Sequence, residues 1–216
     1  MSTPTDSPRP DLPDLILASA SPRRAELLAR VGLRLRVMPA DVDETPLADE
    51  PAIEYARRVS AEKLAAVAAR LENQPEAGLP LLAADTVVVL DRAILGKPAG
   101  AEEAAEMLGR LAGRRHDVVT AYRVQRGTAV AERAVTTVVS FRLLAPDEIT
   151  AYVESGEWRG KAGGYAIQGI AALFATEIRG SITNVVGLPL AEVVADLRAI
   201  GGLPHWPPPG FGGNAT

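Results

Sequence analysis

A short segment of hydroxyl and basic residues, Ser19-Ala20-Ser21-Pro22-Arg23-Arg24, lies where an apolar stretch gives way to a helical pattern. Serine is favoured at a helix N-cap and proline in the first turn, so a helix is expected to begin here. Two arginines in a first turn are unfavourable unless an anion is bound, because the helix dipole is positive at that end. The segment therefore favours a phosphate site, although a solvated arginine pair after an ordinary cap explains the same residues.

Asp85 interrupts an otherwise apolar run at residues 81–90. An isolated buried charge is very costly, so this carboxylate must be paired, hydrogen-bonded or bound to a metal. A structural ion pair with a lysine or arginine would explain it as well as a catalytic role would. Glu44 belongs to the acidic residues 41–44, which could be solvated or could share a divalent cation with Asp85.

Three other polar residues could face the same site. Lys63 lies at the edge of the apolar stripe of an expected helix, and its ammonium can extend into a cleft. Lys97 lies in a constrained Gly-Lys-Pro turn, and Gln168 lies in the glycine-rich residues 160–169. The amide of Gln168 has a donor and an acceptor that can pair with one edge of a planar base. Each could instead be an ordinary surface or turn residue, and His116 is most simply a histidine at a strand entrance.

The elements that must position these residues alternate between helices and strands. Extended segments are expected at residues 15–18, 33–39, 81–90, 93–95, 118–125, 134–144 and 171–178. Helices are expected after Ser21 and at residues 51–71, 101–111, 146–156 and 189–200. Because some neighbouring strands are joined by hairpins, the fold class is α/β with a mixed, partly antiparallel sheet flanked by helices.

The composition suits one domain at residues 15–200. With 216 residues and 47% hydrophobic content, the chain can bury a substantial core. Residues 1–14 and 201–216 are rich in proline or glycine, so we expect them to be flexible tails. The sequence shows neither a signal peptide nor the ~20 apolar residues of a spanning helix, so we expect a cytoplasmic protein without a membrane partner.

Charge and cysteine content narrow the chemistry further. A net charge of −4 and a pI near 5.3 argue against a nucleic-acid partner. The absence of cysteine excludes disulfides, thiolate nucleophiles and cysteine zinc sites, and two histidines exclude a histidine-rich metal site. A metal would therefore be a hard divalent cation, Mg²⁺ or Mn²⁺, held by carboxylates and substrate phosphates.

Taken together, several ordered segments resemble the Maf family of nucleoside triphosphate pyrophosphatases. These segments are residues 17–24, 41–44, 61–63, 84–86, 96–98, 161–169 and 184–190. The resemblance implies a cytoplasmic enzyme with an elongated, two-lobed fold like that of inosine triphosphatases, a central cleft and a homodimer. It also implies cleavage of a nucleoside triphosphate to the monophosphate and diphosphate with a divalent cation. The segment Tyr-Ala-Ile-Gln-Gly at residues 165–169 is similar to the branch that acts on dTTP and UTP.

The resemblance also implies a role for individual residues. Asp85 matches the proton acceptor, and the positions that set substrate specificity match Arg23, Thr86 and Gln168. The charges point to phosphate binding by Arg23, Arg24, Lys63 and Lys97, and Ser19, which matches another active-site position of the family, would bind phosphate with them. A divalent cation near Asp85 and Glu44 would lower the pKa of the attacking water.

Three functions are compared. The leading hypothesis is a dTTP and UTP pyrophosphatase that acts on the nucleotide pool, with a possible link to cell-division arrest. An enzyme acting on 7-methyl-GTP or another modified purine nucleotide is the alternative of the same class, and it is less favoured because that branch carries an acidic residue at position 168. The alternative of another class is a nucleotide-binding regulator of septum formation without significant turnover.

Overall fold

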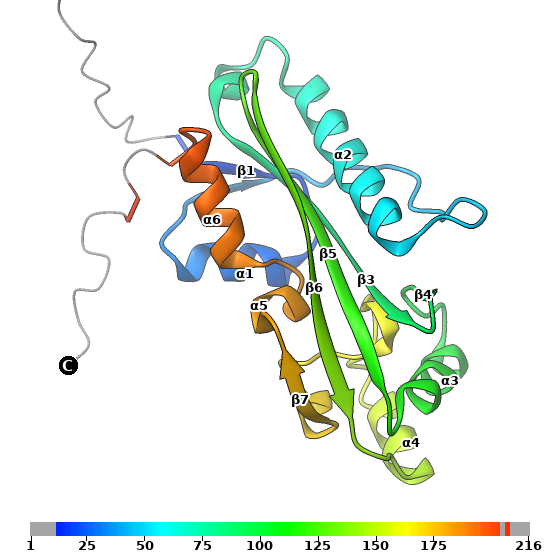
Figure 1. The fold of residues 1–216 in the computed structure, drawn as a ribbon. Helices are drawn as coiled ribbons and strands as arrows, with labels where there is room; N and C mark the ends of the chain where they lie inside the picture. The colour runs from blue at the N-terminus through cyan, green and yellow to red at the C-terminus, as the bar shows by residue number, and fades with distance from the viewer. Residues whose placement is uncertain (1–11, 204–205, 208–216) are drawn as a thin grey trace, which may run out of the picture.

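The computed structural model describes residues 12–203 and 206–207. Its centre is a seven-stranded sheet with the order β2-β1-β3-β5-β6-β7, and β4 pairs with β3 (Figure 1). The strands are β1 (Leu15–Leu17), β2 (Leu35–Val37), β3 (Leu81–Leu90), β4 (Ala93–Leu95), β5 (Arg115–Arg126), β6 (Ala129–Phe141) and β7 (Ala175–Arg179). β1 pairs in parallel with β2 and β3, and the other pairs are antiparallel. This mixed sheet confirms the predicted fold class.

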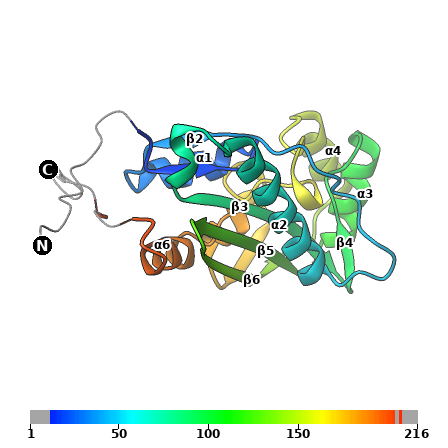
Figure 2. The ribbon, with the colours of Figure 1, turned by 90° about the horizontal axis from the view of Figure 1, so that it is seen from above.

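Helices cover both faces of the sheet (Figure 2). They are α1 (Pro22–Arg30), α2 (Ala52–Leu71), α3 (Ala101–Leu111), α4 (Pro146–Glu154), α5 (Ile182–Val186) and α6 (Leu190–Ala199). Short 3₁₀ turns occur at η1 (Pro75–Gly78), η2 (Ala162–Gly164) and η3 (Ile170–Leu173). Within the described residues, no helix is both long enough and apolar enough to cross a membrane.

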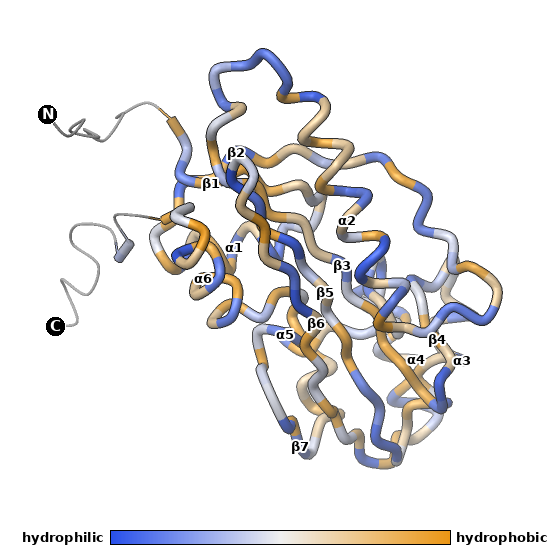
Figure 3. Tube along the Cα trace, turned by 45° about the horizontal axis from the view of Figure 1, so that its top comes forward, coloured by the Kyte–Doolittle hydropathy of each residue, from blue (hydrophilic) through white to orange (hydrophobic). Residues whose placement is uncertain are grey.

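Alternation along β3 assigns its side chains to two different cores. Ala83 packs with α2 on one face, whereas Leu82 packs with α1 and α6 on the other. Farther along the strand, Val88 and Leu90 pack with α3 and α4. The molecule therefore has two lobes along the long β5–β6 hairpin, and Figure 3 shows hydrophilic residues in the turn after α2, away from these cores.

One edge of β3 is interrupted. β1 pairs with Leu81 and Leu82, and β4 pairs with β3 only from Val88 onward. Residues 83–87 therefore have no strand partner on this side, although β5 pairs with them on the other. The glycine-rich segment packs beside this gap, because Gly163 donates its N–H to Gly96 O at 2.9 Å. A Cβ on Gly163, which has a φ of +67°, would lie 2.9 Å from the Val88 side chain, so only glycine fits.

Most elements agree with the sequence predictions, and the strand at residues 81–90 and the helix at residues 101–111 match exactly. The β5–β6 hairpin is longer than expected, because the ladder continues to the pair Arg126 and Ala129. The strand predicted at residues 171–178 begins only at Ala175, since η3 precedes it. The five-residue helix α5 was not predicted, because it is too short to show a periodicity.

The predicted flexible tails lie mostly outside the described residues, at positions 1–11, 204–205 and 208–216. Packing nevertheless extends beyond the predicted domain boundary at residue 200. Leu203 is 6% exposed in the core formed by α1 and α6. The Trp206 indole donates to Val31 O at 3.2 Å. The packed structure therefore extends to Leu203 and Trp206, two apolar residues within the proline- and glycine-rich C-terminal segment.

Candidate active site

A cavity of about 310 Å³ lies at the interrupted edge of β3, between the two lobes. It is lined by all nine residues that the sequence singled out, namely Ser19, Arg23, Arg24, Glu44, Lys63, Asp85, Thr86, Lys97 and Gln168. They come from the β1–α1 junction, the acidic loop, α2, β3, the turn after β4 and the glycine-rich segment. The chain thus brings the predicted residues together, and their roles follow from the contacts described next.

Two carboxylates and two ammonium groups form one side of the cavity. Lys63 Nζ lies 2.7 Å from Asp85 Oδ1 and 2.7 Å from Glu44 Oε1. Lys97 Nζ lies 3.0 Å from Glu44 Oε2. Lys63 and Asp85 are each 6% exposed, so both charges are held largely out of water. Asp85 therefore has the ion-pair partner that its buried position requires, and that partner is itself a cavity residue.

Alternation along β3 explains why this pair forms. Asp85 points to the same face as Ala83, which is the face covered by α2 and therefore by Lys63. The loop before α2 brings Glu44 to the pair, and the Tyr55 hydroxyl fixes this loop by donating to Glu44 O at 2.8 Å. Burial opposes ionisation of Glu44, but its hydrogen bonds to the two lysines outweigh burial and hold its pKa below the ordinary value. Glu44 is therefore a carboxylate at neutral pH.

Arg24 is buried, and its guanidinium donates to four protein oxygens. Nε donates to Gly187 O at 2.7 Å, and one Nη2 hydrogen donates to Thr86 Oγ1 at 2.9 Å. Nη1 donates to Ala84 O at 2.8 Å and to Ser19 Oγ at 3.1 Å. Ala84 O belongs to the interrupted edge of β3, so the arginine replaces a missing strand as its hydrogen-bond partner. This geometry makes Arg24 a residue that joins three segments of the site.

The first turn of α1 is prepared for an anion. The Ser21 side chain makes no capping bond, and Pro22 has no N–H. Ser19 Oγ accepts the Ser21 N–H at 3.1 Å, which turns the chain into the helix. In the described structure no side chain caps this turn and the turn itself contains no acidic residue, so its free N–H groups and positive dipole end can attract an anion in the cavity that it lines.

Two further cations line the cavity without an ion pair in the described part of the chain. The Arg23 side chain donates a long hydrogen bond from Nε to Val186 O at 3.4 Å. Lys161 Nζ donates to Arg159 O at 3.3 Å. Burial lowers the pKa of both side chains, and the positive charge of Arg23 lowers that of Lys161 further. Two partly desolvated cations that lie close enough for one to act on the other are an arrangement that favours an anion between them.

Lys161 was not singled out from the sequence. The available signal was its place next to Gly160 in the glycine-rich segment, where backbone and side chain can both approach a ligand. A lone lysine beside glycines is common in surface turns, however. Lys161 and Arg23 are also far apart in the sequence, so the sequence did not indicate that they lie close together in the fold.

The remaining two predicted residues differ in exposure. Thr86 Oγ1 lies 2.9 Å from Thr120 Oγ1 and 3.3 Å from Gly187 O, so it is held within a hydrogen-bonded cluster at the cavity wall. Gln168 also lines the cavity but is exposed, so its amide is accessible to a ligand. Because adjacent residues of a strand point to opposite faces, Thr86 lies on the α1 side of the sheet and Asp85 on the α2 side.

His116 does not line the cavity. Its ring is 3% exposed, lies edge-on to Phe141, and pairs through Nε2 with the Tyr165 hydroxyl at 2.9 Å. Burial lowers its pKa to about 4. His116 is therefore a neutral core histidine at pH 7, in agreement with the simpler interpretation of the sequence.

The two carboxylates also have the oxygen donors that Mg²⁺ or Mn²⁺ prefers. Glu44 and Asp85 already share a cation, the ammonium of Lys63, so the pair is arranged to bind positive charge. No third carboxylate or histidine completes a metal-ligand cluster in the described part of the chain. The donor set therefore fits a cation that takes its other ligands from substrate and water.

Comparisons with known proteins found similar sequences over most of the chain. A protein of Cereibacter sphaeroides named dTTP/UTP pyrophosphatase is 52% identical over 188 residues, 87% of this chain and 95% of that protein. A protein of the same name from Syntrophotalea carbinolica is 48% identical, with 93% and 91% of the two chains covered. A solved structure, the Staphylococcus aureus Ham1 protein, covers 59% of this chain and 71% of its own at 15% identity; its TM-score of 0.42 is too low to carry an argument. The model of the Maf-like protein family matches residues 14–200, and the chain therefore belongs to the Maf family.

Proposed function

We propose that this protein is a nucleoside triphosphate pyrophosphatase that hydrolyses dTTP and UTP to the monophosphate and diphosphate. The observation that supports this most is the placement of the Asp85 carboxylate in the same cavity as Arg23 and Lys161, two cations that form no ion pair with any described residue. The names of the relatives in Cereibacter and Syntrophotalea support the choice of substrate. The homodimer and the cytoplasmic location implied by the resemblance stay predictions.

The triphosphate would lie along the positively charged wall. The uncapped first turn of α1 and the guanidinium of Arg23 offer N–H donors, and arginine can hold two phosphate oxygens at once. Lys161 and Lys97 supply further positive charge as single ammonium groups. Ser19 and Arg24 support this wall, because Arg24 holds the Ser19 hydroxyl at 3.1 Å.

Gln168 would read the base. The edge of uracil or thymine presents the O4 acceptor and the N3–H donor, and one amide complements both. A base with the opposite pattern leaves polar groups unpaired, which costs roughly 1–3 kcal/mol for each buried group. Thr86 and Arg23, which line the same cavity, would complete the specificity set.

Asp85 would act as the general base. It accepts a proton from a water whose oxygen forms a bond to the α-phosphorus, while the bond from that phosphorus to the bridging oxygen breaks. Diphosphate leaves with the electron pair of that bond. Lys63 donates a hydrogen bond to Asp85 Oδ1 and so holds the carboxylate in place before the reaction. A Mg²⁺ or Mn²⁺ ion held by Asp85 and Glu44 would supply Lewis-acid activation and charge neutralisation.

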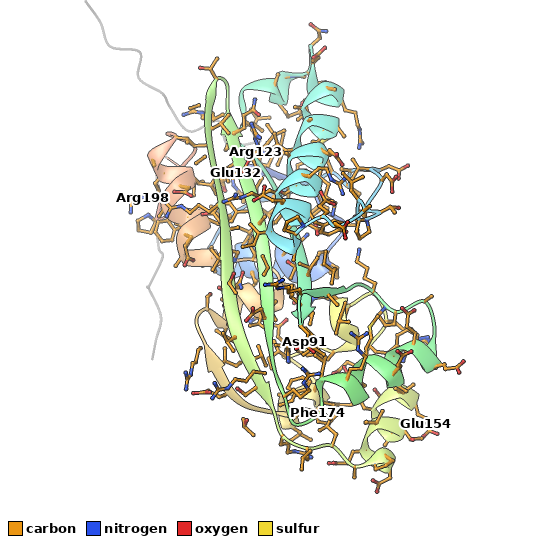
Figure 4. All side chains as sticks on the ribbon, turned by 45° about the vertical axis from the view of Figure 1, so that its right-hand side comes forward. Asp91, Arg123, Glu132, Glu154, Phe174 and Arg198 are labelled. Atoms are coloured by element: carbon orange, nitrogen blue, oxygen red, sulfur yellow. The ribbon has the colours of Figure 1, made fainter. Side chains whose placement is uncertain are left out.

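The test is diphosphate release from standard and modified triphosphates, with Mg²⁺ or Mn²⁺, for wild type and Asp85→Asn. We expect dTTP and UTP to be the preferred substrates and Asp85→Asn to lower kcat by about 10²- to 10⁴-fold. Asp91→Asn is the matched control, because Asp91 lies on the same hairpin but is exposed and pairs with Arg114 (Figure 4). Preference for 7-methyl-GTP, or tight nucleotide binding without diphosphate release, would contradict the proposal.

A further inference from the structure

Gln168, which we propose to read the base, lies on a turn that is held in place by side chains from outside the turn. Residues 166–169 form a turn closed by a bond from the Gly169 N–H to Ala166 O at 3.0 Å. Gln168 is exposed on this turn, and its side chain makes no hydrogen bond in the described structure. The place of the amide in the cavity therefore depends on how the backbone of the turn is held.

Two side chains hold the turn, one at each end. The Tyr152 hydroxyl accepts the Ala166 N–H at 3.1 Å. Glu157 accepts the Ile170 N–H through Oε2 at 2.9 Å and the Ala171 N–H through Oε1 at 3.3 Å. Both carboxylate oxygens are thus used to fix the backbone directly after Gly169. None of these bonds involves a residue that we place in contact with substrate.

The fit between Glu157 and the turn leaves no room for a side chain at position 169. A Cβ on Gly169 would lie 2.0 Å from Glu157 Oε2 and 2.4 Å from its Cδ. The backbone of Gly169 is not in the left-handed region, so the requirement for glycine comes from the carboxylate. The absence of a side chain at Gly169 therefore leaves space for the Glu157 carboxylate that holds the turn.

The two supporting side chains start from a rigid base. Tyr152 lies on α4 and is 2% exposed in the core of the second lobe. Glu157 follows α4 directly and precedes Trp158, which is 5% exposed and donates its indole N–H to Val153 O at 2.9 Å. The helix and the turn after it are therefore anchored on both sides of Glu157.

We propose that Tyr152 and Glu157 are positioning residues that set substrate specificity by clamping the turn that carries Gln168. This inference rests on the proposed function, because it takes Gln168 as the residue that reads the base. The clamp acts on the backbone, so it limits where the amide can lie without touching the nucleotide. Its loss should weaken discrimination between bases more than it slows hydrolysis.

The first experiment compares wild type, Glu157→Gln and Glu154→Gln with UTP and CTP, which differ at the edge that Gln168 would read. A glutamine at 157 can accept only one of the two N–H groups. We expect the ratio of kcat/KM for UTP to that for CTP to fall about 3- to 10-fold in Glu157→Gln, mainly through KM for UTP. Glu154 is the matched control, because it is an exposed acid at the end of the same helix and should leave the ratio unchanged (Figure 4).

Two further variants separate positioning from stability. Gly169→Ala keeps the carboxylate but displaces it, so it should lower the ratio as Glu157→Gln does, and the two changes should not add when combined. In a Gln168→Ala background, Glu157→Gln should have no further effect on the ratio. Amide hydrogen exchange at residues 166–171 should also be faster in Glu157→Gln than in Glu154→Gln.

The outcomes distinguish this inference from the proposed function. A Glu157→Gln protein with a lower Tm but an unchanged ratio and unchanged exchange would overturn the clamp and leave the pyrophosphatase activity standing. A full effect of Glu157→Gln in the Gln168→Ala background would show that Glu157 acts elsewhere, which would also overturn it. A wild-type protein that does not hydrolyse UTP would instead overturn the proposed function, and this inference with it.

Discussion

Replacing Arg24 with lysine separates two roles for this residue. The sequence suggested that Arg24 grips phosphate, whereas the contacts show its guanidinium donating to Gly187 O, Ala84 O, Thr86 Oγ1 and Ser19 Oγ. Lysine keeps the positive charge but has one nitrogen in place of a planar fork. If Arg24 mainly joins segments of the protein, the loss should appear in the free energy of unfolding even without substrate.

The magnitude follows from the number of bonds that a single ammonium cannot make. The guanidinium donates four bonds of 3.1 Å or less, and an ammonium on a straight chain can keep about two of them. A hydrogen bond to a charged donor contributes about 1.5–3 kcal/mol, so losing two costs roughly 3–6 kcal/mol. For a chain of this length each kcal/mol shifts Tm by about 2–4 °C, so we expect a fall of roughly 6–24 °C.

The assay is thermal or urea unfolding of the substrate-free protein, followed by steady-state kinetics with UTP. Arg30→Lys is the matched control, because Arg30 is an exposed arginine in the last turn of the same helix. We expect kcat to fall as well, since Thr86 and Ser19 lose a bond that holds them. An Arg24→Lys protein with wild-type stability and only a higher KM would refute this reasoning and return Arg24 to the role of a phosphate ligand.

Two other predictions concern charge in and near the cavity. Lys161→Gln should raise KM for UTP about tenfold, with a smaller change in kcat, because one cation of the phosphate wall is lost. Arg110→Gln, on the exposed face of α3, is the control. Equal KM values in the two variants would contradict the assignment of Lys161 to phosphate binding. His116 has a pKa of about 4 when folded and about 6.5 when unfolded, so the unfolded chain binds more protons between these values and stability falls as the pH is lowered through this window. This group should contribute a loss of about 2 kcal/mol between pH 7 and pH 5, measured by urea unfolding. The loss should disappear in His116→Phe, and an equal pH dependence in that variant would assign the effect to other groups.

Much of the site could be predicted because its residues violate local rules. Asp85 in an apolar strand, and arginines in a first helical turn, are each costly without a partner, and such costs are visible in the sequence alone. The position of Lys63 at the edge of the apolar stripe of α2 was predictable from helical periodicity, whereas its ion pair with Asp85 was not predicted. These residues were found because their chemistry conflicts with their local surroundings.

The contacts that could not be predicted are those that side chains make with backbone groups far away along the chain. Arg24 and Arg23 are neighbours with the same side chain, yet one is buried among protein oxygens and the other has no ion pair in the described structure. The difference arises from the carbonyl of Ala84, which is available only because no strand pairs with that edge. Likewise, Glu157 has no sequence signal as a partner of residues 170 and 171, because the contact forms across a turn of irregular backbone.

The interrupted edge of β3 has a further consequence for association between molecules. An open strand edge can recruit a strand from another chain and so lead to aggregation. Here β1 and β4 pair with the two ends of this edge, and the Arg24 side chain donates a hydrogen bond to the carbonyl of Ala84 between them. The free stretch is therefore too short and too obstructed for an incoming strand, yet wide enough for a small molecule. The same arrangement that admits a ligand to Asp85 thus keeps this stretch of β3 from pairing with a strand of another molecule.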